Sequence, residues 1–327
     1  MQKFLVIQTA FIGDVVLATA VIEKLYRYFP NAQIDFLLRK GNEGLLTDHP
    51  FVHEILIWNK KKKKIRNLFI LLKKIRNTHY DNVINLHRYA STGILTAFSK
   101  ANETIGFDKN PLSFLFTKKI KHQFSGLHEV ERNNKLVESF TDDSFIKPKL
   151  YPSKKDEERI KDLILEPYIC IMPGSVWFSK RYPIEKWIDF IDRLPEKYQV
   201  YLAGGREDLA LCEAIKKESE NKKVKIVAGQ LSFLSSVALM KKAVMNYTND
   251  SAPLHFTSAT DAPVTAIFCS TAPLLGFTPL SSKSFIVETD VKLDCRPCTL
   301  HGRKACPLGH FKCAYTIETS KLLATLP

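Results

Sequence analysis

The most informative stretch of the chain is TNDSAPLHFTSA, residues 248–259. It follows an apolar run and predicts the end of a buried strand, a tight turn and a helix that Asp250 or Ser251 caps, with Pro253 in its first turn. The free amides and positive dipole end of such a helix bind anions such as a diphosphate. His255 would lie about one turn from Ser251 on the same helix. The alternative is an ordinary strand-to-helix junction of an α/β protein.

A carboxylate, Asp14, stands in the first predicted strand-to-helix loop, QTAFIGDVV. Gly13 is the only glycine of this loop, whereas a dinucleotide-binding loop reads G-x-G-x-x-G, so a hydride-transferring enzyme is disfavoured. Two interpretations of Asp14 stay open. It is either a helix N-cap or a general base whose pKa partial desolvation raises toward a useful range.

Two further junctions in the second half carry groups that suit a nucleotide. In PGSVWFSKRYP, Gly174 and Ser175 allow the backbone to approach an anionic ligand closely, and Lys180 could neutralise a leaving diphosphate. In LAGGRED, Glu207 is placed to accept hydrogen bonds from ribose hydroxyls. The alternatives are a solvated lysine and a carboxylate that complements a helix dipole. Three such junctions in one half indicate a nucleotide site more strongly than any one of them.

Short apolar runs alternate with helical patterns along the whole chain, which predicts parallel sheets built from βαβ units. The expected strands are 4–8, 34–38, 54–58, 82–86, 104–107, 168–172, 199–203, 224–227, 243–247 and 264–269. The expected helices are 15–28, 65–77, 129–140, 184–194, 207–218, 231–242 and 251–260. A polar stretch with prolines, 141–156, predicts a linker between an N-terminal domain, 1–150, and a C-terminal domain, 151–327. Two Rossmann-like domains of this kind bind ligands in a central cleft at the carboxyl ends of their strands.

The composition is that of a globular enzyme with an uneven positive charge. The chain has 327 residues and no apolar run near the ~20 that span a bilayer, and its N-terminus predicts a strand rather than a signal peptide, so we expect a cytoplasmic protein. Of the net charge of +14, the first 150 residues hold 24 Lys and Arg against 14 Asp and Glu. This excess suits a phosphate-rich partner, and a solvated, solubilising surface is the alternative. Anionic glycolipid is favoured over nucleic acid, because no aromatic residues interleave the charges. The densest run is Lys60, Lys61, Lys62, Lys63 and Lys64.

Five motifs, in order, resemble glycosyltransferase family 9, the bacterial ADP-heptose:lipopolysaccharide heptosyltransferases. They are IGDVVLATAVIEKLYRYFPNAQIDFLL, PGSVWFSKRYPIEKW, LAGGRED, TNDSAPLHFTSA and CRPCTLHGRKACPLGHFKC. The resemblance covers nearly the whole chain. It implies a GT-B fold, two Rossmann-like domains with parallel sheets facing a central cleft. It also implies inverting transfer of heptose from ADP-heptose to the lipid A–Kdo inner core at the cytoplasmic face of the inner membrane.

The resemblance assigns roles by motif. Asp14 matches the catalytic base, Lys180 a lysine near the donor phosphates, and Glu207 the acid that holds the ribose. Asp250 matches the aspartate of the donor motif, with Ser251 and His255 beside it. The region 60–140 matches none of the motifs, so Lys60 to Lys64 are assigned to the acceptor from their charge alone, and a sugar other than heptose stays open.

Four cysteines close to the C-terminus have the types and spacing of metal ligands. Cys295, Cys298, Cys306 and Cys313 lie within 19 residues, with His301 and His310 nearby. This makes zinc a candidate, but the spacing is not a paired CxxC…CxxC, and reduced structural thiols or a disulfide formed on handling are favoured. Cys170, Cys212 and Cys269 fit apolar core patterns. We expect no required cofactor and at most an assisting Mg²⁺, since no D-x-D pair stands at a donor-side loop.

The sequence therefore predicts an inverting glycosyltransferase with two rivals. Asp14 would take the proton of the acceptor hydroxyl, while the helix amides after Asp250 and Lys180 hold the diphosphate. One rival is another GT-B enzyme, either a different nucleotide-sugar transferase or a nucleotide-sugar 2-epimerase, which acts on its donor without an acceptor. The other is a non-catalytic binder of anionic glycolipid that uses the basic first half.

Overall fold

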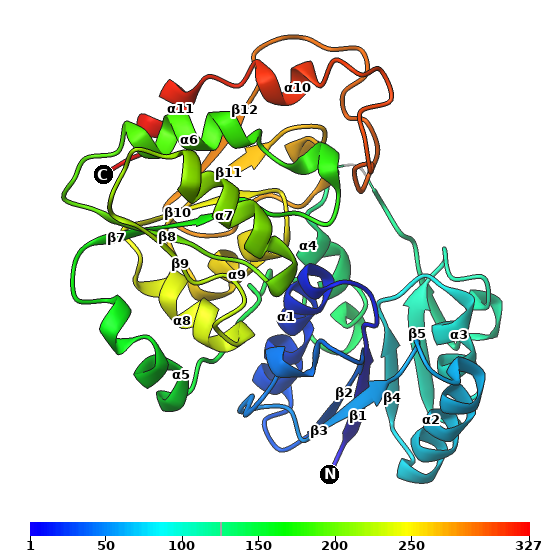
Figure 1. Ribbon diagram of the computed structural model, residues 1–327. Helices are drawn as coiled ribbons and strands as arrows, with labels where there is room; N and C mark the ends of the chain where they lie inside the picture. Colours follow the sequence, from blue (N-terminus) through cyan, green and yellow to red (C-terminus); the bar gives the residue numbers. More distant parts are fainter. Residues whose placement is uncertain (125) are drawn as a thin grey trace. The chain divides into compact units, whose positions relative to one another are not determined.

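The chain folds into two compact α/β units, Met1–Tyr151 and Pro152–Pro327 (Figure 1). The structure, a computed structural model, describes residues 1–124 and 126–327. The division falls inside the proline-containing stretch 141–156. Within the described residues, no helix is both long and apolar enough to cross a membrane.

The first unit is built on a six-stranded parallel sheet in the order β3-β2-β1-β4-β5-β6. Its elements are β1 (Lys3–Ile7), α1 (Ile12–Tyr28), β2 (Gln33–Arg39), β3 (Glu54–Trp58), α2 (Lys64–Thr78), β4 (Asn82–Asn85), α3 (Ala90–Ala97), β5 (Glu103–Phe107), β6 (Lys118–Ile120) and α4 (Glu129–Asn134). Helix α2 shows why they pack: Leu68, Leu71, Leu72 and Ile75, spaced at one helical face, are its buried residues. They join a core on the sheet face that includes Leu5 and Ile7.

The second unit repeats the topology with the order β12-β11-β10-β7-β8-β9, again all parallel. Its elements are α5 (Lys154–Arg159), β7 (Tyr168–Met172), α6 (Ile184–Asp192), β8 (Gln199–Leu202), α7 (Leu209–Glu218), β9 (Val224–Ile226), α8 (Phe233–Lys242), β10 (Met245–Asn249), α9 (Ala252–Thr260), β11 (Val264–Phe268), β12 (Ser284–Glu288), α10 (Lys312–Tyr315) and α11 (Thr319–Leu323). Helices α6, α7 and α11 cover one sheet face and share a large core. Helices α5, α8 and α9 pack next to one another in turn.

In each unit the strand order reverses beside the first strand, between β1 and β4 and between β7 and β10. In open α/β sheets, ligands bind outside the carboxyl ends of the strands at this switch point, where the two flanking loops diverge. The loops that follow β1, β7 and β10 are the ones that carry Asp14, Lys180 and Asp250. The topology therefore puts these predicted residues at the two places where such sheets bind ligands.

Several expected elements differ in the structure. Strands β6 and β12 and the short helices α3, α5, α10 and α11 were not predicted, and α5 begins inside the expected linker. The helix expected over 129–140 ends at Asn134 and is followed by a short 3₁₀ turn. Strand β10 extends to Asn249, whose buried side-chain amide has partners in the loop after β7: Asn249 Nδ2 donates to Pro173 O, and Asn249 Oδ1 accepts from the Tyr182 N–H. A buried amide with such partners is compatible with a central strand, although the residue type argues against one.

Candidate active site

The β10–α9 junction holds a buried ion pair. Asp250 is 4% exposed. Its Oδ2 lies 2.8 Å from Lys180 Nζ and accepts a hydrogen bond of 2.6 Å from Thr271 Oγ1. A lysine from the β7 loop and a threonine that follows β11 therefore converge on one carboxylate after β10. This ion pair therefore lies at the carboxyl edge of the second sheet.

The prediction that a side chain caps α9 is wrong. Ser251 occupies the cap position without a capping hydrogen bond, and Asp250 is turned to Lys180. The first turn offers the hydroxyl no donor, because Pro253 has no N–H and the Leu254 N–H donates to Ser251 O. Within the described chain the Ser251 hydroxyl is buried without a hydrogen-bond partner. A buried unpaired hydroxyl at a helix N-terminus is suited to an anionic ligand.

The loop after β7 is fastened to the end of β10 by Asn249, a residue the sequence reasoning missed. Asn249 Nδ2 donates to Pro173 O at 2.8 Å, and Asn249 Oδ1 accepts from the Tyr182 N–H at 2.9 Å. Arg181 Nε donates to Ser175 O at 2.8 Å and closes the same loop. The loop that carries Lys180 is thus held at both ends.

Gly174 has a contact within the chain that the sequence did not predict. A Cβ on Gly174 would lie 2.0 Å from Asp208 Oδ1, and one on Gly204 would lie 2.5 Å from Asp208 Oδ2. The two glycines therefore make room for a carboxylate of this chain, which also accepts from the Gly205 N–H at 2.9 Å. Burial raises the pKa of Asp208. The neighbouring Glu207, the predicted ribose ligand, is exposed in a 3₁₀ turn before α7.

His255 lies on α9 as predicted, and it is 5% exposed with its ring centroid 6.2 Å from that of Phe277. The imidazole is therefore a buried side chain of α9 beside Phe277.

In the first unit, Asp14 is the third residue of α1 and its Oδ2 accepts from the Phe11 N–H at 3.0 Å. The carboxylate thus takes part in capping, and it remains half-exposed. The charge of Asp14 acts on the pKa of two neighbours, Arg39 and Glu129. Burial raises the pKa of Glu129, whose Oε2 accepts from Arg132 Nε at 2.9 Å. Asp14 therefore stands at the end of β1 within a set of charged side chains.

The five predicted acceptor lysines do not form one equivalent set. Lys61 to Lys64 are exposed. Lys60 is half-buried: its Nζ donates to Thr9 O at 2.9 Å and to Thr9 Oγ1 at 3.0 Å, and lies 4.7 Å from the Trp58 ring. Burial, with the charges of Arg39 and Lys64, lowers the pKa of Lys60 to about 8.

His87 completes the carboxyl edge of the first sheet, and the sequence reasoning did not single it out. It follows β4, and its Nδ1 lies 3.2 Å from Thr9 Oγ1. Burial and the charges of Lys60 and Arg88 lower the pKa of His87 to about 3, so the ring is neutral at pH 7. Thr9, Lys60 and His87 thus form a polar cluster at the β1–β4 switch point.

The remaining cysteine and metal predictions also have a structural outcome. Cys170, Cys212 and Cys269 are fully buried core residues, as predicted. All seven cysteines are free thiols. Across residues 1–124 and 126–327, no three His, Cys, Asp or Glu side chains are arranged, as they stand, to hold a metal ion.

The comparisons with known proteins point to one family. The sequence profile described as glycosyltransferase family 9 (heptosyltransferase) matches residues 68–308. Lipopolysaccharide heptosyltransferase 3 of Escherichia coli is 30% identical over 277 residues, covering 80% of this chain and 82% of that protein. Among solved structures, the family 9 glycosyltransferase of Veillonella parvula DSM 2008 gives a TM-score of 0.87 at 20% identity, covering 99% and 96% of the two chains. E. coli ADP-heptose lps heptosyltransferase II gives 0.80 at 20% identity, covering 99% and 98%. The predicted GT-B fold class is confirmed.

Proposed function

Because the chain belongs to glycosyltransferase family 9, we propose that it transfers a heptose from ADP-heptose to the lipid A–Kdo inner core of lipopolysaccharide. The observation that carries the donor half is the junction after β10. There Lys180 pairs with Asp250, and the hydroxyl of Ser251 is buried without a partner in the described chain. A cation, a free hydroxyl and a helix N-terminus together suit a diphosphate. The choice of heptose as the transferred sugar rests on the relatives in the family, which are named heptosyltransferases.

The proposed reaction is a single displacement with inversion. The acceptor hydroxyl attacks the anomeric carbon and gives its proton to the Asp14 carboxylate, while the bond from that carbon to the diphosphate oxygen breaks. Lys180, the Ser251 hydroxyl and the positive N-terminal end of α9 hold the charge that develops on the departing ADP. Asn249 keeps Lys180 in place through its bonds to Pro173 and Tyr182. Every atom is then accounted for without a covalent glycosyl-enzyme.

The ribose of the donor is held, in this proposal, at the turn after β8. Glu207 is exposed there and accepts ribose hydroxyls. A thermal-shift comparison of ADP, UDP and GDP at low salt tests the donor. If ADP alone raises the Tm, and raises it less in Glu207→Ala, the result supports ADP-heptose as the donor. A preference for UDP or GDP would still agree with a family 9 transferase but would contradict heptose as the transferred sugar. Conversion of a nucleotide sugar without acceptor would favour the epimerase alternative.

The acceptor, in this proposal, binds the first unit. Lys60 is a half-buried cation beside Thr9 and His87, and it is placed to hold a carboxylate or phosphate of an anionic sugar. The exposed Lys61 to Lys64 add long-range attraction. Lys60→Met is expected to raise the acceptor KM by tenfold or more. Lys62→Met, a matched exposed lysine, is expected to change it less than twofold at 150 mM salt.

We further propose peripheral contact of a cytoplasmic protein with the inner membrane face, through α2. The outer face of this helix exposes Ile65, Phe69 and Ile70, at 69%, 61% and 55%, next to the lysine run. Apolar side chains flanked by cations bind anionic bilayers. Sedimentation with anionic vesicles tests this. The double change Ile65→Ser and Phe69→Ser should release the protein, whereas Leu165→Ser, an equally exposed site in the second unit, should not.

The proposed transfer step needs no resident cofactor, with Mg²⁺ at most assisting the diphosphate. Lys180 and the Ser251 hydroxyl already supply donors for the leaving group at the N-terminal end of α9. Turnover measured after removal of free Mg²⁺ tests this directly. Loss of more than about tenfold, recovered by adding Mg²⁺ back, would assign the ion a required role.

A further inference from the structure

A long segment between β12 and α10, residues 289–311, contains neither helix nor strand. Loops of more than about 12–15 residues without such structure are uncommon in compact domains, and the ordered ones usually serve a function. The proposed transfer step assigns no role to this segment. Its hydrogen bonds lead to the loops after β7 and β11, which carry Lys180 and Thr271, the two partners of Asp250.

Arg296 fastens this segment to the loop after β11. Its guanidinium donates to Phe268 O at 3.1 Å, and to Cys269 O and Thr271 O at 2.8 Å each. It also pairs with the carboxylate of Glu288 at the end of β12. A guanidinium carries its donors in a fixed plane, so one side chain sets the direction of three carbonyls. The Arg296 side chain is 13% exposed, which keeps most water away from these bonds.

Thr271 connects Arg296 to the ion pair of the donor junction. The residue is fully buried; its carbonyl accepts from Arg296, and its Oγ1 donates to Asp250 Oδ2 at 2.6 Å. The same Asp250 oxygen lies 2.8 Å from Lys180 Nζ. Because a threonine side chain has few rotamers, a fixed backbone at Thr271 also fixes the direction of its hydroxyl. Contacts of 2.8 Å or less therefore lead from Arg296 to Lys180.

The backbone of the segment reinforces this connection at the loop after β7. The Arg303 N–H donates to Ser179 Oγ at 2.8 Å, and the Ser179 N–H donates to Arg303 O at 3.1 Å. Ser179 Oγ also lies 2.8 Å from Ser270 Oγ, beside Thr271. Ser179 and Ser270 are each 1% exposed. The segment thus holds the residue before Lys180 as well as the residues around Thr271.

We propose that Arg296 is a positioning residue for the donor. It holds Thr271 so that Asp250 and Lys180 keep the arrangement in which Lys180 meets the diphosphate. Arg296 itself contacts neither substrate in this proposal, and Glu288 orients its guanidinium. The role in donor binding rests on the proposed function. The coupling between Arg296 and Thr271 rests on the hydrogen bonds alone.

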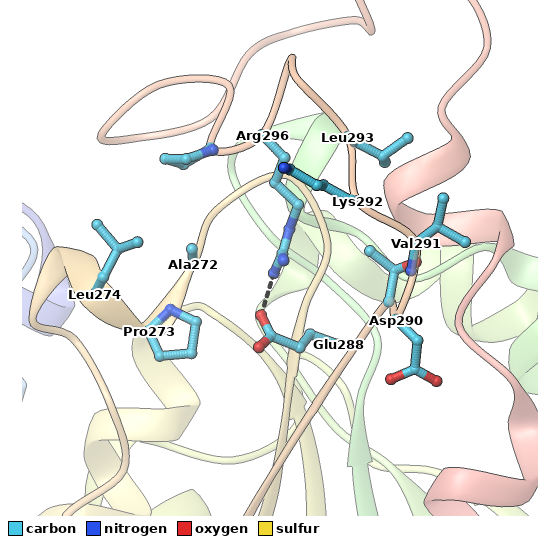
Figure 2. Close-up of a pocket in the computed structure, with 11 residues that line it drawn as sticks. Ala272, Pro273, Leu274, Glu288, Asp290, Val291, Lys292, Leu293 and Arg296 are labelled. Atoms are coloured by element: carbon cyan, nitrogen blue, oxygen red, sulfur yellow. Dashed lines mark hydrogen bonds and ion pairs between the residues drawn. The ribbon is translucent and has the colours of Figure 1, made fainter.

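The guanidinium of Arg296 can be replaced from solvent, because it lines a pocket of about 460 Å³. Figure 2 shows it facing Glu288, with Pro273 and Leu274 on one side and Val291 on the other. Leu274 and Val291 are 65% and 47% exposed, so the pocket is open to water. Arg296→Ala would leave a carboxylate and three carbonyls around a space that a small guanidinium ion can enter.

Calorimetry with ADP and the full chain tests the proposal. We expect ADP to bind Arg296→Ala about tenfold more weakly, the lower end of the range for one hydrogen bond to a charged group, because Lys180 is displaced but still present. The matched control is Lys321→Ala. Lys321 holds the same end of β12 from α11, since its Nζ donates to Glu288 O at 3.0 Å and lies 2.6 Å from Asp290 Oδ1. The control should bind ADP within twofold of the wild type.

Chemical rescue separates positioning from a general loss of structure. Methylguanidinium at millimolar concentration should restore ADP affinity to Arg296→Ala, whereas methylammonium, which lacks the planar set of donors, should not. A folded Arg296→Ala variant that binds ADP within twofold of the wild type would overturn the proposal. A loss of affinity that methylguanidinium does not restore would overturn it too, because the guanidinium would then not be the group that matters.

A double-variant cycle tests the path through Thr271. If Arg296 acts through the Thr271 hydroxyl, Arg296→Ala combined with Thr271→Val should bind ADP about as weakly as the weaker single variant. Losses that simply multiply would contradict this path. If Arg296→Ala does not fold, Arg296→Lys takes its place in the cycle. A wild type that binds no ADP would refute the proposed function instead, and urea unfolding of the same four proteins would still show whether Arg296 and Thr271 are coupled.

Discussion

Lys180 is predicted to serve two partners, Asp250 of this chain and the diphosphate of the donor, and Lys180→Met removes both interactions. Its Nζ is 2.8 Å from Asp250 Oδ2, and its side chain is 14% exposed. A hydrogen bond between charged groups contributes about 1.5–3 kcal/mol. At 1.4 kcal/mol per factor of ten, the loss of one such bond to the diphosphate should weaken ADP binding by about 10- to 150-fold.

The same change removes the cation beside the Asp250 carboxylate, which is 5% exposed and still accepts from Thr271 Oγ1. A buried carboxylate that loses its cation costs about 3–5 kcal/mol of unfolding free energy. The double variant Lys180→Met with Asp250→Asn removes the orphaned charge and should recover most of that stability without recovering ADP affinity.

Calorimetry with ADP and urea unfolding of the wild type, both single variants and the double variant provide the full cycle. The reasoning is refuted if Lys180→Met binds ADP within twofold of the wild type while it loses stability. That result would make the lysine a partner of Asp250 alone, and the diphosphate site would lie elsewhere.

Three further predictions concern single positions. Asp14→Asn keeps an acceptor for the Phe11 N–H, so we expect the variant to bind ADP as the wild type does. Its kcat, measured as ADP release with acceptor present, should be lower by about 10²–10⁴. An equal loss of ADP binding would make Asp14 structural. The pKa of Lys60 falls from 10.5 to about 8 on folding, so the unfolded chain binds more protons between these values and stability rises with pH there. Urea unfolding at pH 7.5 and 10 should show that Lys60→Met flattens this rise; an unchanged slope contradicts the shift. Gly174→Ala places a Cβ 2.0 Å from Asp208 Oδ1 and should cost about 1–3 kcal/mol in unfolding free energy. A second change, Asp208→Ala, should recover part of that loss. An unchanged Tm for Gly174→Ala would refute the close contact between Gly174 and Asp208.

The architecture was accessible from the sequence because it depends on local periodicity. The burial of apolar runs such as 168–172, and of helical faces such as that of α2, can be predicted from the sequence pattern alone. The repeated βαβ order then predicts two parallel sheets. The elements that were missed are the weakly patterned ones. Strand β6 has three residues and no buried one, and α3 is a short helix with a central glycine.

The sequence predicted which loops carry the candidate site but not which side chains meet there. The sequence placed Lys180 and Asp250 on separate strand-to-helix junctions, but their ion pair depends on β7 and β10 being neighbours in the sheet. The same holds for Asp208, whose carboxylate fills the space beside Gly174. A glycine next to a phosphate and a glycine next to a carboxylate look alike in sequence. Charge runs are equally ambiguous, since burial separates Lys60 from the four lysines after it.

The central claim, acceptor-dependent transfer of heptose from ADP-heptose, is tested most directly by mass spectrometry of the acceptor. The protein is incubated with ADP-heptose and a lipid A–Kdo acceptor that lacks heptose, with Asp14→Asn as the matched control. We predict that the acceptor gains one heptose, that ADP is released in equal amount, and that the control does neither. Consumption of ADP-heptose at the same rate without acceptor, or an unmodified acceptor with a donor that binds, would contradict the proposed function.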